Sequence, residues 1–164
     1  MSTLPASSIS LDTRAAVEEL YAHYVKCLDD GAFDQWPGFF TKDCVYKLQA
    51  RENYDRGLPL ALMMFESHAM LVDRVFGITT TLYHQPYYQR HIVSGLMVNR
   101  NPDGSLHAEA NYAVFRTKRN ALTDVFNVGR YLDEIVEVEG TLKFRQKLCI
   151  YDSELVPNSL IYPI

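Results

Sequence analysis

Histidine side chains are the groups of this chain best suited to acid–base or metal chemistry, because their unperturbed pKa lies near about 6.5. The sequence contains five: His23, His68, His84, His91 and His107. A metal site on a helix needs two histidines at i and i+4, or a carboxylate on the same face. Asp73 follows His68 at i+5, off that face, and Pro86 interrupts the stretch between His84 and His91. We therefore predict structural or interface roles for the histidines rather than metal binding.

Tyrosine is unusually frequent, with 11 residues, and Tyr83, Tyr87 and Tyr88 surround His84 in the sequence. A tyrosine ring has an apolar body and a polar tip, which suits both wet pockets and interfaces. The simpler interpretation is a rim of aromatic side chains at a sheet edge or an interface. The alternative interpretation is a substrate cavity lined by tyrosine hydroxyls and histidine.

The cavity interpretation leads to a catalytic hypothesis, a free-standing dehydratase or isomerase. His91 or His84 would act as general base, Asp73 would orient that base, and a tyrosine hydroxyl would act as acid. The hypothesis requires these groups to lie within hydrogen-bond reach inside a cavity open to solvent. A third hypothesis is a ligand-binding or protein-interaction module that carries no chemistry.

Sequence motifs for cofactors and nucleophiles are absent from the chain. It has no G-x-S-x-G turn, no Walker loop and no G-x-G-x-x-G loop. Cys27, Cys44 and Cys149 lie far apart, and no Cys-x-His or Cys-x-x-His pair is available to hold a Rieske cluster. The spacing gives no support for an iron site of two histidines and a carboxylate. Free thiols favour a reducing cytoplasm.

Composition and charge exclude several classes of protein. The chain has 164 residues, 48% hydrophobic and 22% charged, which fits one globular domain rather than a disordered or coiled-coil chain. The net charge is −4, and we expect the two densest basic groups, 116–119 and 143–147, to form solvated strand faces. Because no signal peptide and no membrane-length apolar run is found, we expect a cytoplasmic protein with neither nucleic acid nor membrane as a partner.

Three helices are predicted in the first half of the chain. Apolar residues at i, i+3, i+4 and i+7 predict a helix of about 17 residues with Asp12 as its N-cap. Residues 32–41 predict a second, short helix with an aromatic side, and residues 44–48 predict a short strand. Residues 60–76 predict a third helix, ended by Gly77. Since this third helix is apolar on most sides, we expect it to be buried between layers or against a partner.

Long strands are predicted in the second half. Alternating apolar and polar residues predict them over 88–100, 106–115, 124–138 and 142–150, with turns at 101–104 and 139–140. Such lengths require twist, bulges and curvature. Helices followed by an antiparallel meander predict an α+β fold with the helices on one face of the sheet. We also predict an N-terminal arm over 1–11, a loop over 50–58 and a single domain over 12–164.

Three segments of the chain carry a family resemblance: 28–36 with 40–46, 83–94, and 144–152 with the short hydrophobic tail that follows. The first begins Leu-Asp-Asp-Gly-Ala-Phe-Asp and the second begins Tyr-His-Gln-Pro-Tyr-Tyr. In order, spacing and total length they resemble the small (β) subunit of bacterial Rieske-type ring-hydroxylating dioxygenases. Two positions depart from the family pattern, which often has Asn where Gly95 stands and Ser where Tyr87 stands.

The resemblance implies a cone-shaped fold of the nuclear-transport-factor-2 type, shared with scytalone dehydratase and ketosteroid isomerase. It implies a larger α subunit with a Rieske [2Fe–2S] cluster and a mononuclear non-heme Fe(II), in an α3β3 hexamer with contacts between β chains. A β subunit of this family usually supplies no catalytic residue, so we expect no catalytic, cofactor-binding or metal-binding residue here. The substrate it suggests is an aromatic acid such as salicylate, anthranilate or terephthalate.

Overall fold

The computed structural model describes residues 9–153, 155 and 160–164. The predicted arm over 1–11 therefore lies largely outside the described residues. The first helix, α1, spans Leu11–Asp29 and confirms the first predicted helix. Its cap is Ser10 rather than Asp12, because the Ser10 hydroxyl accepts a hydrogen bond from the Thr13 backbone N–H at 3.1 Å.

The second predicted helix is present as a 3-10 helix, η1 (Phe33–Phe39). It leads into the strand β1 (Phe40–Ala50), which is longer than the predicted strand. The predicted loop after it contains a short helix, α2 (Arg51–Asp55). The aromatic side of η1 is confirmed as part of the core, since Trp36 is fully buried and packs edge-on against Phe40.

The predicted helix over 60–76 is wrong in its first half. A short strand, β2 (Met63–Phe65), pairs there with β1, because an apolar run of this length fits an edge strand as well as a helix. The Ser67 hydroxyl then caps a shorter helix, α3 (His68–Phe76). The helical path does not stop at Gly77 but continues through a π-helical turn, η2 (Gly77–Thr81).

Six strands form one sheet in the order β2-β1-β6-β5-β4-β3. The predicted meander is confirmed, because the last four strands pair antiparallel in sequence order: β3 (Tyr87–Arg100), β4 (Leu106–Lys118), β5 (Asp124–Val138) and β6 (Thr141–Tyr151). β1 lies beside β6 in parallel orientation. Local patterns do not encode this pairing, since it joins residues far apart in the sequence, such as Tyr46 and Lys147.

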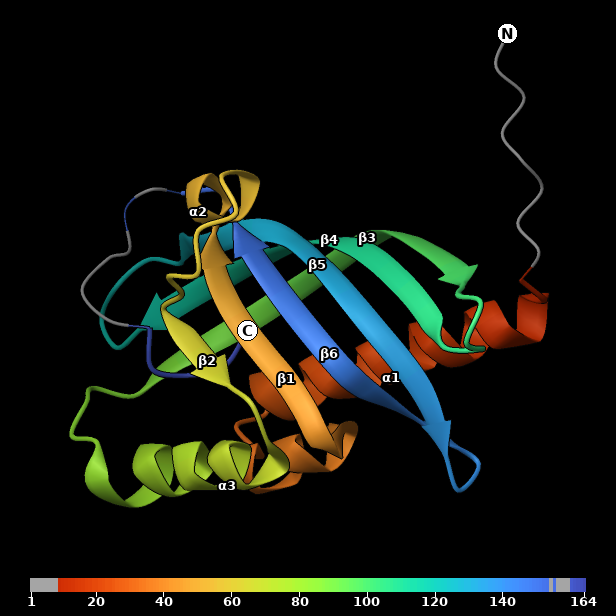
Figure 1. Cartoon of the computed structure of the whole chain (residues 1–164). Helices are drawn as coiled ribbons and strands as arrows, with labels where there is room; N and C mark the ends of the chain where they lie inside the picture. Colours follow the sequence, from red (N-terminus) through yellow and green to blue (C-terminus); the bar gives the residue numbers. More distant parts are fainter. Residues whose placement is uncertain (1–8, 154, 156–159) are drawn as a thin grey trace, which may run out of the picture.

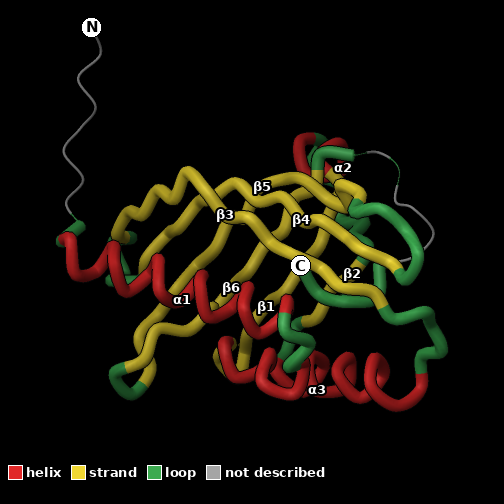
Figure 2. Tube along the Cα trace, turned by 180° about the vertical axis from the view of Figure 1, so that it is seen from behind, coloured by secondary structure: helices red, strands yellow, loops and turns green. Residues whose placement is uncertain are grey.

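The sheet curls around α1 into a cone (Figure 1). Seen from behind, α1 crosses the concave side of the strands, and α3 lies beside the β1 and β2 edge (Figure 2). Bulges contribute to the curvature, one of them between Ser94 and Met97 in β3. Gly95 lies in this bulge with φ +66°, a conformation that Gly adopts freely and Asn tolerates, which explains the departure from the family pattern. The predicted cone-shaped α+β fold is confirmed.

The core lies between the sheet and α1. The buried residues of α1 share one stripe, as predicted: Val17, Leu20, Tyr21, Tyr24, Cys27 and Leu28. Gly129 allows β5 to approach β6 closely, because a Cβ at this position would lie 2.0 Å from the Ile150 carbonyl oxygen. Within the described part of the chain, no helix has both the length and the apolar character that crossing a bilayer demands.

Candidate functional site

A buried ion pair lies in the interior of the cone, between Lys147 on β6 and Asp133 on β5. The Lys147 Nζ and Asp133 Oδ2 atoms are 2.8 Å apart, and both side chains are 0% exposed. Tyr21 of α1 donates its hydroxyl to the same carboxylate oxygen. Four aromatic rings surround the ammonium group, with Nζ between 3.6 and 4.7 Å from their centroids: Tyr21, Tyr24, Tyr131 and Phe144. The interior therefore holds a paired cation in an aromatic cage.

The charged groups of this cluster are paired with one another, as in a structural core network. Burial raises the pKa of Asp133 above its usual value, and the Lys147 ammonium and the Tyr21 hydroxyl oppose that rise. Burial also raises the pKa of Tyr21 well above its usual value, and the Asp133 carboxylate adds to this effect. Because these groups bond to one another rather than face an opening, we interpret the cluster as structural.

The sequence pattern misplaced Lys147. Alternation along the strand puts it on the solvent face together with Lys143 and Arg145. The β5–β6 pairing shifts its register between Glu134 and Ile135, so Lys147 turns inward. A one-residue shift exchanges the two faces of a strand and leaves no signal in composition or alternation.

The basic group 116–119 also contains a buried cation. Arg116 is 7% exposed, so the expectation of a fully solvated face was wrong there. Its guanidinium lies 4.2 Å from the centroid of the Phe126 ring and donates to Asp124 at 2.6 Å. Arg116 is thus engaged within the chain, whereas Arg119 is exposed, as predicted.

The last described residues, 160–164, fill the rest of the cone. Ile164 is fully buried, and its carbonyl oxygen accepts hydrogen bonds from the hydroxyls of Tyr24 at 2.8 Å and Tyr46 at 3.2 Å. The Tyr46 hydroxyl also accepts from the Ile164 backbone N–H at 2.9 Å. The hydroxyls of Tyr24 and Tyr46 therefore bind the chain's own backbone rather than a substrate.

His91 lies away from its hypothetical catalytic partners. Its Nδ1 is 2.6 Å from Asp29 Oδ1, and its backbone N–H donates to both carboxylate oxygens, at 3.0 and 3.1 Å. Both side chains are buried. Because β3 is an edge strand, Asp29 at the end of α1 covers a backbone N–H that the edge would otherwise leave free. The prediction of a structural role for His91 agrees with this geometry.

The other groups of the catalytic hypothesis do not converge with His91. Asp73 is exposed on α3, and His84 Nε2 lies 2.8 Å from the Tyr162 hydroxyl. Tyr83 and Tyr88 are largely exposed. The geometry contradicts the proposed dehydratase or isomerase site, whereas exposed tyrosines next to an edge strand agree with the rim interpretation.

A surface groove of about 670 Å³ lies between α1, η1 and the turn that joins β5 to β6. Two of its polar residues form ion pairs: His23 with Glu19 of α1 at 3.5 Å, and Lys26 with Asp30, the residue after α1, at 2.5 Å. Burial raises the pKa of Cys27, which lines the groove, to about 11. The Cys27 thiol is therefore protonated near neutral pH and a poor nucleophile.

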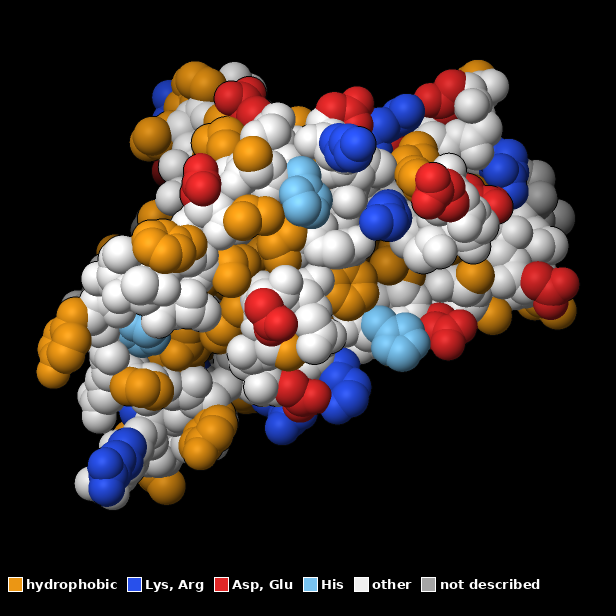
Figure 3. Space-filling view, turned by 90° about the horizontal axis from the view of Figure 1, so that it is seen from below, with side chains coloured by type: hydrophobic (Ala, Val, Ile, Leu, Met, Phe, Trp, Pro, Cys, Tyr) orange, Lys and Arg blue, Asp and Glu red, His pale blue; other side chains and the backbone are white. Residues whose placement is uncertain are grey.

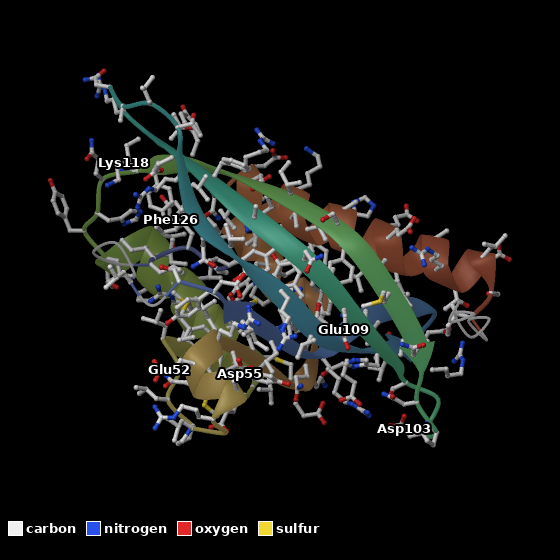
Figure 4. The ribbon with its side chains drawn as sticks, turned by 90° about the horizontal axis from the view of Figure 1, so that it is seen from above. Glu52, Asp55, Asp103, Glu109, Lys118 and Phe126 are labelled. Carbon is white, nitrogen blue, oxygen red and sulfur yellow. The ribbon has the colours of Figure 1, made fainter. Side chains whose placement is uncertain are left out.

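Charged side chains project from the outer side of the sheet and from the segments beside it; Figure 4 labels Glu109 on β4, Asp103 in the turn between β3 and β4, and Asp55 on α2. His107 Nε2 lies 3.0 Å from Glu109 Oε1, and Arg145 reaches Asp103 at 2.8 Å and Glu134 at 2.5 Å. These charged side chains bind one another and do not converge on a common metal ion. In the described ranges, no group of three or more His, Cys, Asp or Glu side chains could hold a metal ion.

Exposed apolar side chains follow the chain from Leu58, before β2, to Tyr83, after η2, and we call them the 58–83 surface. The exposed apolar side chains of this segment are Leu58, Leu60, Leu62, Met64, Met70, Val72, Phe76, Leu82 and Tyr83. Seen from below, hydrophobic side chains gather on the side of the molecule where α3 lies (Figure 3). Contiguous apolar patches on a soluble chain mark contacts with other proteins or ligands. The expected burial of the third helix is thus not met within this chain.

Sequence comparison identifies the family of this chain, which combines a filled interior with the exposed 58–83 surface. The family model described as "Ring hydroxylating beta subunit" matches residues 23–158. The chain belongs to the ring-hydroxylating beta subunit family. Chains of this family are the non-catalytic subunits of ring-hydroxylating dioxygenases, which are oxidoreductases. The resemblance found in the three sequence segments is confirmed.

Curated relatives of this beta subunit support the assignment over most of the chain. The anthranilate 1,2-dioxygenase small subunit of Burkholderia cepacia is 34% identical over 145 residues, which are 88% of this chain and 90% of the relative. A terephthalate 1,2-dioxygenase terminal oxygenase subunit, beta 2, of Comamonas is 29% identical over 143 residues, 87% of this chain and 93% of the relative.

Solved structures agree with the fold of this beta subunit. The beta subunit of an aromatic-ring-hydroxylating dioxygenase from Novosphingobium aromaticivorans superposes with a TM-score of 0.85 at 35% identity, covering 93% of this chain and 97% of that one. A scytalone-dehydratase-like protein from the same organism has a TM-score of 0.70 at 15% identity, with 93% and 92% covered. The second likeness concerns the fold alone, and it confirms the predicted kinship of folds.

Proposed function

We propose that this chain is the structural beta subunit of a terminal oxygenase that hydroxylates the ring of an aromatic acid. The observation that carries the proposal is the combination of a filled cone and an exposed apolar surface, in a chain of the ring-hydroxylating beta subunit family. An interior closed by its own residues supports a scaffold role, and the open 58–83 surface supports a protein partner. Anthranilate and terephthalate, named for two relatives, are both aromatic carboxylic acids, which supports the substrate class.

The proposed partner is a large α subunit that carries the Rieske [2Fe–2S] cluster and the mononuclear non-heme Fe(II). We propose an α3β3 assembly in the cytoplasm, with additional contacts between beta subunits. Residues 12–164 would act in it as one domain, without contact to nucleic acid or membrane. In this assignment the chain supplies no catalytic, cofactor-binding or metal-binding residue, and its effect on turnover comes from holding the α subunit in place.

The experiment that tests this proposal is the mass and iron content of the native complex, from light scattering on a sizing column and metal analysis. We expect a co-purifying large chain, a mass that fits equal numbers of the two chains, and about three irons per αβ pair, two in the cluster and one mononuclear. An iron-free monomer or small homo-oligomer would overturn the proposal. A complex with iron but a different chain ratio would overturn only the α3β3 stoichiometry.

A further inference from the structure

Residues 160–164, which we call the strap, are bound along their backbone by side chains from distant elements. Arg74 of α3 donates to the carbonyl oxygens of Leu160 at 3.3 Å and Ile161 at 2.5 Å. Gln89 of β3 donates to the Pro163 carbonyl at 3.3 Å. Beyond it, Ile164 receives the Tyr24 and Tyr46 hydroxyls described above. The strap therefore runs from α3 to the centre of the cone.

Apart from the strap, α3 is held by apolar packing beside η1 and β1, through the buried Leu71 and the partly buried Val75. Of its nine residues, Leu71 is the one that is buried. Arg74 is its only Lys or Arg, and within the described residues it forms no ion pair. A partly buried guanidinium needs hydrogen-bond acceptors, and Arg74 donates to the two strap carbonyls. The polar attachment of α3 to the interior therefore runs through the strap.

The segment that follows α3 is held by the strap as well. His84 Nε2 lies 2.8 Å from the Tyr162 hydroxyl. The Tyr162 ring packs between the rings of Phe33 and Tyr87, with centroid distances of 4.6 and 4.5 Å. The strap thus fixes the chain on both sides of η2, and with it the Met70-to-Tyr83 part of the 58–83 surface.

The 58–83 surface fits a partner with an apolar patch and a basic rim. Glu66 and Asp73 are exposed in this segment, and its single cation, Arg74, is engaged with the strap. A second copy of this chain has a net charge of −4, which opposes contact with an acidic rim. A chain of different sequence, the large subunit, is the occupant that this charge pattern favours.

We propose that the strap positions α3, and through it the surface on which the large subunit docks. The inference rests on the proposed function and assigns a positioning role to Arg74, the strap and Tyr46. Contacts inside the cone then control assembly at the surface, although Tyr46 is fully buried and cannot touch a partner.

The test compares Arg74→Met with a matched control, Arg14→Met, in the small subunit and in its complex with the large subunit. Arg14 of α1 also holds a backbone carbonyl of another element, that of Leu96, at 3.0 Å. We expect Arg74→Met to weaken binding of the large subunit about tenfold or more, and to speed hydrogen exchange in 68–76. Arg14→Met is expected to leave both unchanged.

Tyr46→Phe is the second variant and tests whether the effect travels along the strap. It removes the hydroxyl that hydrogen-bonds to Ile164 and changes no residue of the 58–83 surface. We expect faster exchange in α3 and weaker assembly, in the same direction as Arg74→Met. Arg74→Lys keeps a cation near the carbonyls and should restore part of the binding, which also covers the case in which Arg74→Met does not fold.

The outcomes separate this inference from the proposed function. If the wild-type chain forms no complex with an iron-carrying large subunit, the proposed function fails. If the wild-type complex forms and Arg74→Met and Tyr46→Phe assemble as well as Arg14→Met, only the positioning role fails. If Arg74→Met changes self-association of the small subunit but not its affinity for the large subunit, the surface lies between copies of this chain and the inference is overturned.

Discussion

The helices α1 and α3 lie against the same sheet and bury their apolar residues in opposite ways. α1 turns six buried side chains to the core and presents charged residues such as Glu19 and Lys26 to solvent. α3 buries Leu71 alone and leaves Val72 and Phe76 about half exposed, at 47% and 59%. A helix with polar outer residues is complete within its own chain, whereas a helix with apolar outer residues is half of an interface.

The difference indicates that α1 stabilises the fold, whereas the exposed side of α3 forms the contact with a partner. The contacts of α1 reach the centre of the molecule, through the Tyr21 hydroxyl on Asp133 and the Asp29 carboxylate on the β3 edge. α3 reaches the core through Leu71 and, by way of Arg74, through the strap. We therefore expect changes under α1 to reduce the free energy of unfolding, and changes on the exposed side of α3 to reduce assembly instead.

Lys147→Met is expected to have the largest effect on folding. Removing the ammonium leaves the Asp133 carboxylate buried without its cation, which costs about 3–5 kcal/mol of unfolding free energy. Urea unfolding of the isolated chain measures the loss. Adding Asp133→Asn to Lys147→Met should recover part of it, since no uncompensated charge remains. A loss under about 1 kcal/mol for Lys147→Met would mean that the pair does not anchor the interior.

Truncation of one leucine in each helix compares their contributions directly. Leu28 on α1 and Leu71 on α3 are both shielded from solvent, at 1% and 0% exposed. Leu→Ala changes cost about 2–5 kcal/mol, and we expect Leu28→Ala near the upper end and Leu71→Ala near the lower end, because a cavity under α3 collapses more easily. The measurement is again urea unfolding. Equal losses would contradict the division between the two helices.

Phe76→Ser on α3 is expected to separate assembly from stability. Phe76 is exposed in the chain, so the free energy of unfolding should change by less than about 0.5 kcal/mol. If the large subunit covers it, binding should weaken by about 1–3 kcal/mol. Calorimetric titration of the large subunit measures the second quantity, with Lys26→Ser on the outer side of α1 as control. Weaker binding by the control and not by Phe76→Ser would reverse the comparison.

Titration of Asp103 is expected to show the smallest effect, on the charged outer face. Hydrogen bonds from Ser105 and Arg145 lower the pKa of Asp103 to about 2. Because the folded value lies below the unfolded one, the contribution is present above about pH 4 and is lost as the pH falls toward about 2. NMR should give a midpoint near the lower value. Arg145→Met should raise it, while Arg51→Met, at another surface pair, should not.

Much of the fold could be predicted from local patterns. The stripe of α1, the four long strands and their turns follow from spacing and from turn residues alone, and the structure agrees. The wrong predictions lie where one sequence pattern is compatible with two kinds of secondary structure. Residues 60–65 are apolar enough for either a helix or an edge strand, and their pairing with β1 decides between them. The parallel pairing of β1 with β6 depends on contacts between residues far apart in the sequence, which no local sequence window contains.

For the candidate site the sequence left two interpretations open, an aromatic rim and a catalytic cavity, and the tertiary contacts decide between them. Sequence could name His91, His84 and Asp73 as groups capable of acid–base chemistry, but not that Asp29 would be the partner of His91. It could not show Lys147 inside the cone, because a register shift in the sheet turned the side chain inward. The family resemblance supplied the subunit assignment that residue types alone left open.

Hydrogen exchange of the beta subunit, alone and in the native complex with its large subunit, tests the central claim most directly. The account predicts strong added protection in α3 and the rest of the 58–83 surface on assembly, and little change in α1, whose contacts are already complete. Added protection confined to the outer side of α1, with α3 exchanging as in the isolated chain, would contradict it.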